Sequence, residues 1–103
     1  MLFMVHIEVK IPGDMPQNQK DDLRQRENAR AMELMKAGKM RRAWRIVGQV
    51  ANFSLWEADS LEEMHANVGS LPMYPYMNVT VTPLIAHPST EAWQRAHGAL
   101  PVL

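Results

Sequence analysis

The chain has 103 residues, a formal net charge of zero at pH 7 and a sequence isoelectric point near 6.9. This length is typical of a single domain, and the balanced charge argues against a nucleic-acid-binding protein, which needs basic residues clustered on one face. The absence of cysteine excludes disulfide bonds, thiolate metal sites and a cysteine nucleophile, and makes the reducing cytoplasm the simplest expected compartment.

The N-terminal segment, residues 2–10, alternates between two kinds of position. Phe3, Val5, Ile7 and Val9 would share one face, and this period of two predicts a half-buried β-strand. The run "MLFMVHIEV" has no basic start and is interrupted by polar residues, so it predicts neither a signal peptide nor a membrane span. The prolines and glycine of "IPGDMP" then end the strand.

Residues 16–37 are good helix formers, and Gly38 follows as a C-terminal stop. The apolar stripe of the predicted helix passes through Leu23 and Ala31. Glu27 lies on the same stripe, four residues after the first and four before the second. The pattern therefore puts a carboxylate where a core residue is expected.

Residues 40–57 are long enough for two strands, with "VGQ" as the bend between them. A second helix follows and opens with a capping box, in which Ser60 caps the helix and Glu63 reaches back. Two prolines exclude regular helix in "LPMYPYM". "MNVTVTPL" is a last alternating strand that ends at Pro83.

This order of elements, strand–helix–strand–strand–helix–strand, is the split βαβ or ferredoxin-like plan. We therefore expect an α+β fold over residues 1–88, with two helices on one face of an antiparallel sheet. Residues 89–103 would form a C-terminal tail in which Ser89 caps a short helix. The tail either folds back on its own subunit or docks on a neighbouring subunit through Trp93 and Leu103.

Glu27 has two interpretations. As a structural residue it would lie at the edge of the stripe and pair with Lys20 or Arg30. As a functional residue it would point into a cleft between helix and sheet, where burial raises its pKa and suits it to act as a general base. A carboxylate in a dry pocket can move the proton α to a carbonyl group.

The strands carry further candidates. Arg45 would either pair with a sheet carboxylate such as Glu57 or Glu8, or hold a carboxylate ligand with its planar guanidinium. Asn52 and Ser54 share a strand face at a spacing of two. They would either satisfy backbone groups or donate hydrogen bonds to a carbonyl or lactone oxygen.

Two other candidates lie in irregular segments: Tyr76 would pack or donate a proton, and His87 would serve a site or a turn. The four histidines lack metal-binding spacing, so no zinc site is expected. There is no phosphate-binding glycine loop, dinucleotide fingerprint or G-x-S-x-G elbow. Nucleotide chemistry, hydride transfer and a serine triad therefore lack support, and no metal or cofactor is expected.

The fragments "MLFMV", "ELMKAGK", "WRIVGQVANFSLWE", "LPMYPYMNVTVTPL" and "HPS" together resemble the muconolactone isomerase (muconolactone Δ-isomerase) family. The combination of W-R-I-x-G-x-x-A-N with L-P-x-x-P-Y-M is specific, and the resemblance covers about the first 89 residues. The chain has Phe53 where the family pattern favours tyrosine, Met73 and Tyr74 where it favours Leu-Phe, and Asn78 where it favours aspartate.

The resemblance implies a ferredoxin-like subunit in a homo-oligomer, a decamer in the family. It also implies a cofactor-free step of the β-ketoadipate pathway of aromatic (catechol) degradation, in which muconolactone becomes 3-oxoadipate enol-lactone. This shift of a ring double bond needs a base, donors for a dienolate oxygen and a cation for the acetate arm. On this resemblance Glu27 would be the base, Asn52 or Tyr76 would bind the oxygen, and Arg45 or Lys20 would bind the acetate.

Three other functions fit the same residues. A chloromuconolactone dehalogenase needs the same proton abstraction before chloride leaves. A dimeric α+β barrel protein would bind a small acid without catalysis, and a cofactor-free monooxygenase could share the architecture. All these functions concern a small molecule, with neither nucleic acid nor a membrane as partner.

Overall fold

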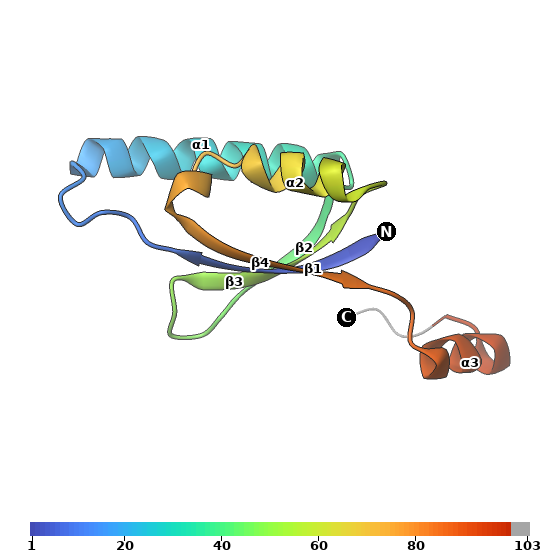
Figure 1. Ribbon diagram of the computed structural model, residues 1–103. Helices are drawn as coiled ribbons and strands as arrows, with labels where there is room; N and C mark the ends of the chain where they lie inside the picture. The colour runs from blue at the N-terminus through green and yellow to red at the C-terminus, as the bar shows by residue number, and fades with distance from the viewer. Residues whose placement is uncertain (100–103) are drawn as a thin grey trace.

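The chain follows the predicted order of strands and helices (Figure 1). The structure is a computed structural model and describes residues 1–99. Its elements are β1 (Leu2–Val9), α1 (Gln17–Lys36), β2 (Met40–Arg45), β3 (Ala51–Glu57), α2 (Leu61–Gly69), the 3₁₀ helix η1 (Tyr74–Tyr76), β4 (Met77–Leu84) and α3 (Pro88–His97). The expected ferredoxin-like α+β fold is therefore confirmed.

The four strands form one antiparallel sheet in the order β2-β3-β1-β4. The central strand β1 pairs with β3 on one side and β4 on the other, so that Val5 lies opposite Ser54 and Val81. Phe3 and Ile7 point to the same side as Val5, and all three are buried. The half-buried strand predicted from the period of two is confirmed.

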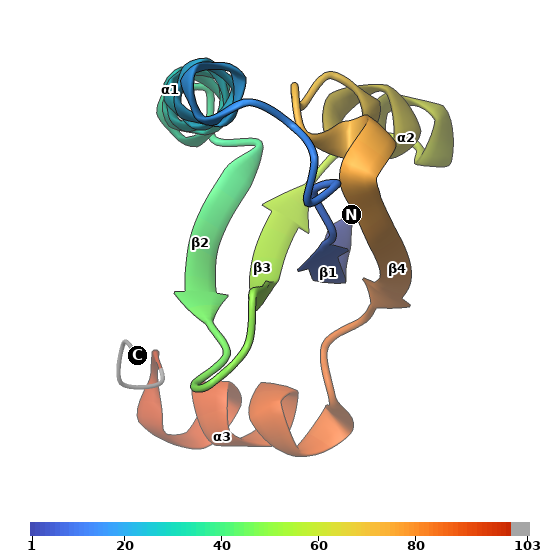
Figure 2. The same ribbon diagram turned by 90° about the vertical axis from the view of Figure 1, so that its left-hand side faces the viewer.

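Both helices of the ferredoxin-like unit cover the same face of the sheet (Figures 1 and 2). Helix α1 lies over the β2 side and α2 lies over the β4 side (Figure 2). The core between the layers is built from large apolar side chains, with Trp56 and Phe3 fully buried. The indole Nε1 of Trp56 donates a hydrogen bond of 2.7 Å to Ser54 Oγ, so the largest core residue leaves no polar atom without a partner.

Helix α1 ends as the sequence predicts. It contains no glycine, proline or β-branched residue, and Gly38 follows with a left-handed φ of 75°. The N–H of Gly38 donates to Met35 O at 3.0 Å, and the N–H of Lys39 donates to Leu34 O at 2.9 Å. This pair of bonds is a Schellman motif, which turns the chain directly into β2.

Helix α2 begins with the predicted cap. Ser60 Oγ accepts a 3.0 Å hydrogen bond from the N–H of Glu63. The Glu63 carboxylate reaches back to the N–H of Asp59 at 2.7 Å, one residue before the cap itself. Glu63 also forms an ion pair of 2.6 Å with Lys39, which joins the start of α2 to the turn after α1.

Two boundaries differ from the sequence-based expectation. Strand β4 continues through Pro83 to Leu84, because β4 is an edge strand and a missing N–H there disrupts no ladder. Helix α3 is capped by His87 and not by Ser89, because His87 Nδ1 accepts a 3.0 Å bond from the N–H of Ser89. A ring nitrogen is not among the usual capping groups, so the sequence pattern pointed to the serine.

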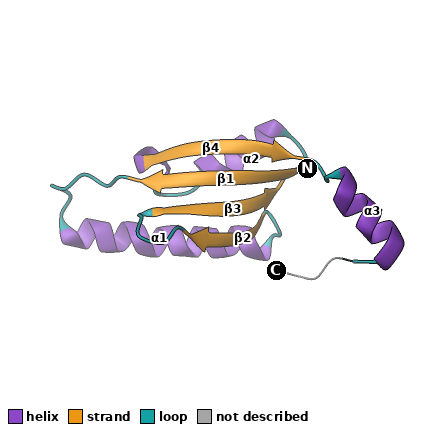
Figure 3. Ribbon diagram, turned by 90° about the horizontal axis from the view of Figure 1, so that it is seen from below, coloured by secondary structure: helices purple, strands orange, loops and turns teal. Residues whose placement is uncertain are grey.

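Helix α3 projects beyond the end of the sheet (Figures 1 and 3). None of its residues is buried, and Trp93 remains 46% exposed although its ring lies 4.2 Å from that of His97. The described part of the tail therefore does not fold back onto its own core. Leu103, the other expected anchor, lies outside the described residues.

The sheet face opposite the helices is uncovered (Figure 3). Trp44 lies opposite Phe53, which lies opposite His6, so one row of rings crosses three strands of this face. Trp44 is 37% and Phe53 is 44% exposed. Within residues 1–99, no helix has both the length and the apolar character that a membrane crossing requires.

We predict that Ser60→Ala lowers the free energy of unfolding by about 1 kcal/mol, the usual value of an N-cap hydroxyl. The matched control is Ser89→Ala at the start of α3, where the histidine caps and no core residue depends on the helix. Urea unfolding followed by circular dichroism measures both variants. Equal stability of the Ser60 and Ser89 variants would contradict the prediction.

Candidate active site

Helix α1 is anchored on the sheet at two points that are eleven residues apart. Leu23 and Leu34 are both buried, and at 1.5 Å per residue they lie about 16 Å apart along the axis. Between them the helix presents Glu27 and Ala31, which are only half-buried. A polar side chain and a methyl group cannot fill the space that two leucines would fill, so the helix and the sheet leave a gap there.

This gap is a cleft of about 590 Å³ between α1, β1, β2 and β3, closed at one end by the segment before β4. Its sheet side carries small or polar residues, among them Ala43, Ser54 and Asn52. The complete lining is Ile7, Val9, Ile11, Arg24, Glu27, Asn28, Ala31, Met35, Met40, Ala43, Trp44, Arg45, Val50, Ala51, Asn52, Ser54, Leu71, Met73 and Met77. The cleft is apolar with a few polar groups, as is usual for sites that bind small molecules.

The strand register brings the polar sheet residues together. Arg45 of β2 lies directly opposite Asn52 of β3, and Asn52 lies opposite Ile7 of β1. Opposed residues of antiparallel strands point to the same face, so the guanidinium and the amide both lie on the helix side. Ser54 is two residues further along the same face.

The Glu27 carboxylate is the titratable group most affected by the cleft. Burial raises its pKa above the ordinary value of a glutamate, and a hydrogen bond from the backbone N–H of Met73 acts in the opposite direction. That bond joins Met73 N to Glu27 Oε1 at 2.8 Å. The net result is a carboxylate whose pKa lies above its usual range, as expected of a general base in a dry site.

The ion pairs of α1 leave Glu27 without a cation. Arg30 donates to Glu33 at 2.9 Å and to Ser70 Oγ at 3.0 Å, so it does not compensate Glu27. No ion pair within residues 1–99 involves Glu27 or Lys20. The structural interpretation, in which Glu27 pairs with Lys20 or Arg30, is therefore wrong.

Two arginines of the cleft also have no ion pair with an acidic side chain of residues 1–99. Glu57, one expected partner of Arg45, pairs with Arg41 at 3.3 Å. In the described chain, neither Arg45 nor Arg24 takes part in an ion pair. The cleft therefore combines a desolvated carboxylate with two guanidinium groups that are available to an anionic ligand.

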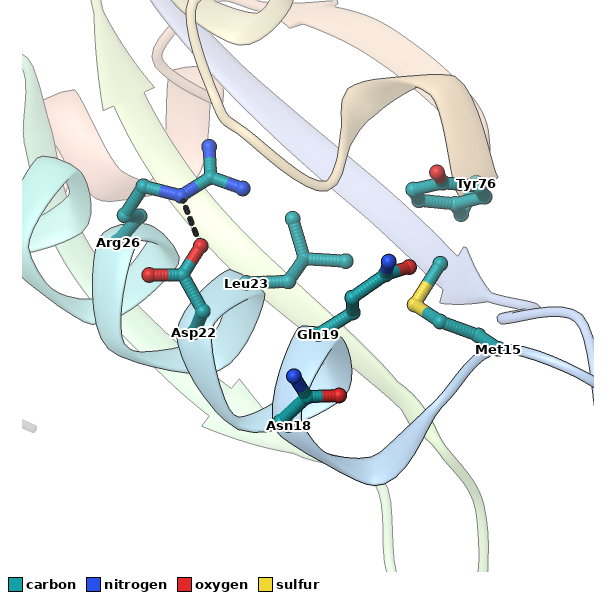
Figure 4. Close-up of a pocket in the computed structure, with 7 residues that line it drawn as sticks. All are labelled: Met15, Asn18, Gln19, Asp22, Leu23, Arg26 and Tyr76. Atoms are coloured by element: carbon teal, nitrogen blue, oxygen red, sulfur yellow. Dashed lines mark hydrogen bonds and ion pairs between the residues drawn. The ribbon is translucent and has the colours of Figure 1, made fainter.

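A second hollow of about 360 Å³ lies nearer the start of α1, between that helix and Tyr76 (Figure 4). Its only oppositely charged side chains, Asp22 and Arg26, pair with each other at 2.9 Å. Leu23 lies between them and Tyr76 (Figure 4). The hollow thus offers amide groups and a phenol, but no unpaired carboxylate that could act as a base.

The structure brings four of the seven predicted site residues into one cleft: Glu27, Arg45, Asn52 and Ser54. The other three lie elsewhere. Tyr76 borders the second hollow, Lys20 lines neither space, and His87 is exposed and caps α3. Ser54 has a structural bond as well, because its Oγ accepts from Trp56.

The sequence analysis missed Arg24, Asn28 and the backbone of Met73. Arg24 and Asn28 follow from helical spacing, since positions 24, 28, 31 and 35 share one face with Glu27. The Met73 donor joins residues 46 positions apart through a main-chain group, and no side-chain pattern announces such a contact. Within residues 1–99, no group of three or more His, Cys, Asp or Glu residues could hold a metal ion.

This arrangement suits proton transfer on a small anionic molecule. A carboxylate with a raised pKa accepts or returns a proton, an amide nearby donates to an oxygen, and a guanidinium binds a carboxylate. Each group comes from a different element, and the helix and sheet hold them around one apolar space.

Comparison with known proteins identifies the family of the chain. The model of the family described as muconolactone delta-isomerase matches residues 1–90. A muconolactone Delta-isomerase of Cupriavidus pinatubonensis is 43% identical over 90 residues, which is 87% of this chain and 98% of that protein. One from Rhodococcus opacus is 40% identical over 88 residues, covering 85% of this chain and 95% of the relative.

Solved structures give the same result. A crystal structure of muconolactone isomerase superposes with a TM-score of 0.82 at 39% identity, over 86% of this chain and 93% of the other. A 5-chloro-2-hydroxyhydroquinone dehydrochlorinase from Burkholderia phenoliruptrix matches with a TM-score of 0.65 over 86% of this chain and 98% of that one, but at 21% identity it shows the fold alone. The chain belongs to the muconolactone Δ-isomerase family, as its sequence motifs predicted.

Proposed function

We propose that the protein converts muconolactone to 3-oxoadipate enol-lactone by proton transfer through Glu27. The observation that carries the proposal is a half-buried carboxylate without a cationic partner in residues 1–99, in a cleft that it shares with Arg45 and Asn52. The family membership supplies the substrate, since the relatives are named for this reaction.

The reaction is a proton shift with no net redox change. The ring carbon that bears the acetate arm loses its proton to Glu27, and the electron pair of that C–H bond is delocalised through the ring double bond onto the carbonyl oxygen of the lactone. The resulting dienolate then takes the same proton back at the carbon α to the carbonyl group. One carboxylate performs both transfers if both carbons expose the same ring face to it.

The other residues act by binding. Asn52 would donate to the carbonyl oxygen of the lactone, where charge develops in the transition state. Arg45 binds the acetate carboxylate, and Arg24 assists from the helix side of the same cleft. Tyr76 and Lys20, the alternatives for these two roles, do not line the cleft in the single chain.

The proposed biological setting is the β-ketoadipate pathway of catechol degradation in the cytoplasm, with no cofactor. An ultraviolet assay with muconolactone tests the activity directly. The same assay with a chlorinated muconolactone, and with and without oxygen, separates the isomerase from a dehalogenase and from a monooxygenase. No turnover of muconolactone by the folded protein would overturn the proposal in favour of small-acid binding.

We predict that Glu27→Gln lowers kcat by about 10²–10⁴-fold, the usual contribution of a general base. The amide keeps the size of the side chain and an acceptor for the Met73 N–H, but it cannot take up a proton. Glu33→Gln, on the same helix and in an exposed pair with Arg30, is the matched control and should keep near-normal turnover.

Stability provides the second measurement on the same two variants. A raised pKa means that the protonated form of Glu27 is favoured by folding, so its contribution to stability is present below pH 4.5, the ordinary glutamate value, and is lost as pH rises through the raised pKa. Glu27→Gln should therefore melt above the wild type at pH 7. The difference in melting temperature should shrink as pH falls through the raised pKa of Glu27 and should be absent below pH 4.5. A destabilised variant with near-normal kcat would exclude Glu27 as the base.

We predict that Arg45→Lys raises KM, because lysine keeps the charge but loses the two-pronged hydrogen bonding of the guanidinium. Arg45→Ala should raise KM by roughly 10–100-fold, the value of a hydrogen bond to a charged group, and Arg24→Ala should raise it less. Arg41→Ala on the same strand is the control. An unchanged KM for Arg45→Ala together with a raised KM for Lys20→Ala would show that Lys20, and not Arg45, binds the acetate.

Two surfaces support assembly into a homo-oligomer, whose subunit number, ten by the family resemblance, stays a prediction. The first is the open sheet face, where the rings of Trp44 and Phe53 are exposed. The second is α3, which extends past the sheet and leaves Trp93 exposed (Figure 1). A second copy of the chain would cover both surfaces, and the tail from residue 89 would then dock on that neighbour.

Light scattering at micromolar concentration should give a mass several times the 11.8 kDa of the chain. Phe53→Glu should weaken assembly by burying a charge, whereas Met32→Glu, exposed on the outer side of α1, should not. Removal of residues 89–103 should weaken assembly more than it unfolds the subunit. A monomer mass for the intact chain would refute the oligomer, and an unchanged mass after truncation would refute the docking tail.

A further inference from the structure

The Glu27 carboxylate has a single hydrogen-bond donor among residues 1–99, the backbone N–H of Met73. The bond is 2.8 Å long and ends on Oε1. Within residues 1–99 the other oxygen, Oε2, has no hydrogen-bond donor, and Glu27 lines the cleft. The two oxygens of the candidate base are therefore not equivalent.

The donor belongs to a tightly bonded segment. The N–H of Tyr74 donates to Leu71 O at 2.9 Å, and the N–H of Tyr76 donates to Met73 O at 2.8 Å. Met73 has φ −82° and ψ −1°, the conformation of the third residue of a type I turn, and the proline before it occupies the position that proline favours. The direction of the Met73 N–H is thus fixed by the main chain.

The segment is also tied to the sheet. Tyr76 O accepts a 2.8 Å hydrogen bond from the N–H of Lys10, just after β1, and β4 begins at the next residue. Leu71 is buried in the core at the other end. The turn is therefore held at both ends, and the Met73 amide cannot move away from Glu27 without breaking these contacts.

We propose that the Met73 backbone amide is a positioning group for the base: it holds Oε1 of Glu27 and leaves Oε2 to carry the proton. The proposal rests on the function proposed above for Glu27. A carboxylate held at one oxygen keeps one orientation toward the ring, which matters when the same group must take a proton from one carbon and return it to another.

The Met73 amide also affects the pH range over which the Glu27 carboxylate is ionised. Burial favours the neutral acid, whereas an N–H that donates to the carboxylate favours the charged form. Without this donor, burial would act alone, so the pKa of Glu27 would rise further. A larger fraction of the protein would then hold a carboxylic acid that cannot accept a proton.

Replacement of the Met73 amide by an ester keeps the side chain and removes the N–H, while it also weakens the Pro72 carbonyl as an acceptor. The pKa of Glu27 in the ligand-free protein, followed by NMR of labelled glutamate, should rise by about one unit. The acid limb of the pH profile of kcat/KM should move to higher pH by the same amount. On the pH-independent plateau, kcat should fall about tenfold because the Glu27 carboxylate loses its fixed orientation. The matched control is an ester at Tyr74, which removes one bond of the same turn, the one to Leu71 O, but keeps the Met73 N–H that donates to Glu27.

A Met73 ester that leaves the pKa and the acid limb in place, or moves them no further than the Tyr74 ester does, overturns the proposal. If the ester protein does not fold, the wild type still decides: the Met73 amide proton shift should titrate with the Glu27 carboxyl, and a shift indifferent to that titration overturns the proposal. The NMR titrations need no substrate. A rise in the pKa of Glu27 in a protein that does not act on muconolactone would therefore reject the proposed function and keep the Met73 contact.

Discussion

Helix α1 packs on the sheet through two leucines. The candidate active site depends on the looser packing of the helix against the sheet between these two residues. Leu23 and Leu34 are buried, while Glu27 and Ala31 between them are only half-buried, with Ala31 at the margin of the core. On the sheet side, the cleft lining includes the small or polar residues Ala43, Asn52 and Ser54. The cleft is a place where the helix and the sheet are not closely packed, so it contributes little to stability. The stability of the fold must therefore come from the rest of the core, which includes Phe3 and Trp56.

The charged residues outside the cleft and those inside it differ in whether they form ion pairs. Outside it, Arg26, Arg30 and Arg41 have carboxylate partners within the described chain, and each of these pairs is exposed enough to contribute little to stability. Inside it, no ion pair within residues 1–99 joins Glu27 to Arg24 or Arg45. A direct pair between Glu27 and a cation would lower the pKa of Glu27 and would occupy the cation of the proposed acetate site, so the lack of a pair suits both proposed roles.

Much of this could be predicted from the sequence because the signals are periodic. Period two in β1 and helical spacing in α1 determine which side chains face each other, and Glu27 was recognisable because it interrupts an apolar stripe. Arg24 and Asn28 obey the same spacing and were within reach of the same reasoning. The cap of α3 was assigned to Ser89 because serine is the usual capping residue, whereas His87 provides the acceptor.

The Met73 contact belongs to a different class, because it depends on where a turn places a main-chain N–H across 46 positions. Because the donor is a main-chain group, no pattern of side chains in the sequence indicates this contact. The placement of Lys20 and Tyr76 outside the cleft has a similar cause. Both lie close to Glu27 along the chain or in the fold, but the direction of each side chain is set by helix and turn geometry, which composition does not encode.

The separation of charges has a consequence for how a ligand arrives. The protein is neutral as a whole, yet the cleft lining holds two arginines, Arg24 and Arg45, against one acidic residue, Glu27. The cleft therefore has an excess of positive charge that the net charge of the chain does not show. A monoanionic lactone would be drawn toward this cleft over distances of about one Debye length, roughly 8–10 Å at physiological ionic strength. Neutral or cationic metabolites of the same size would feel no such attraction, and the first selection among ligands would take place in solution, before any of them touches the base.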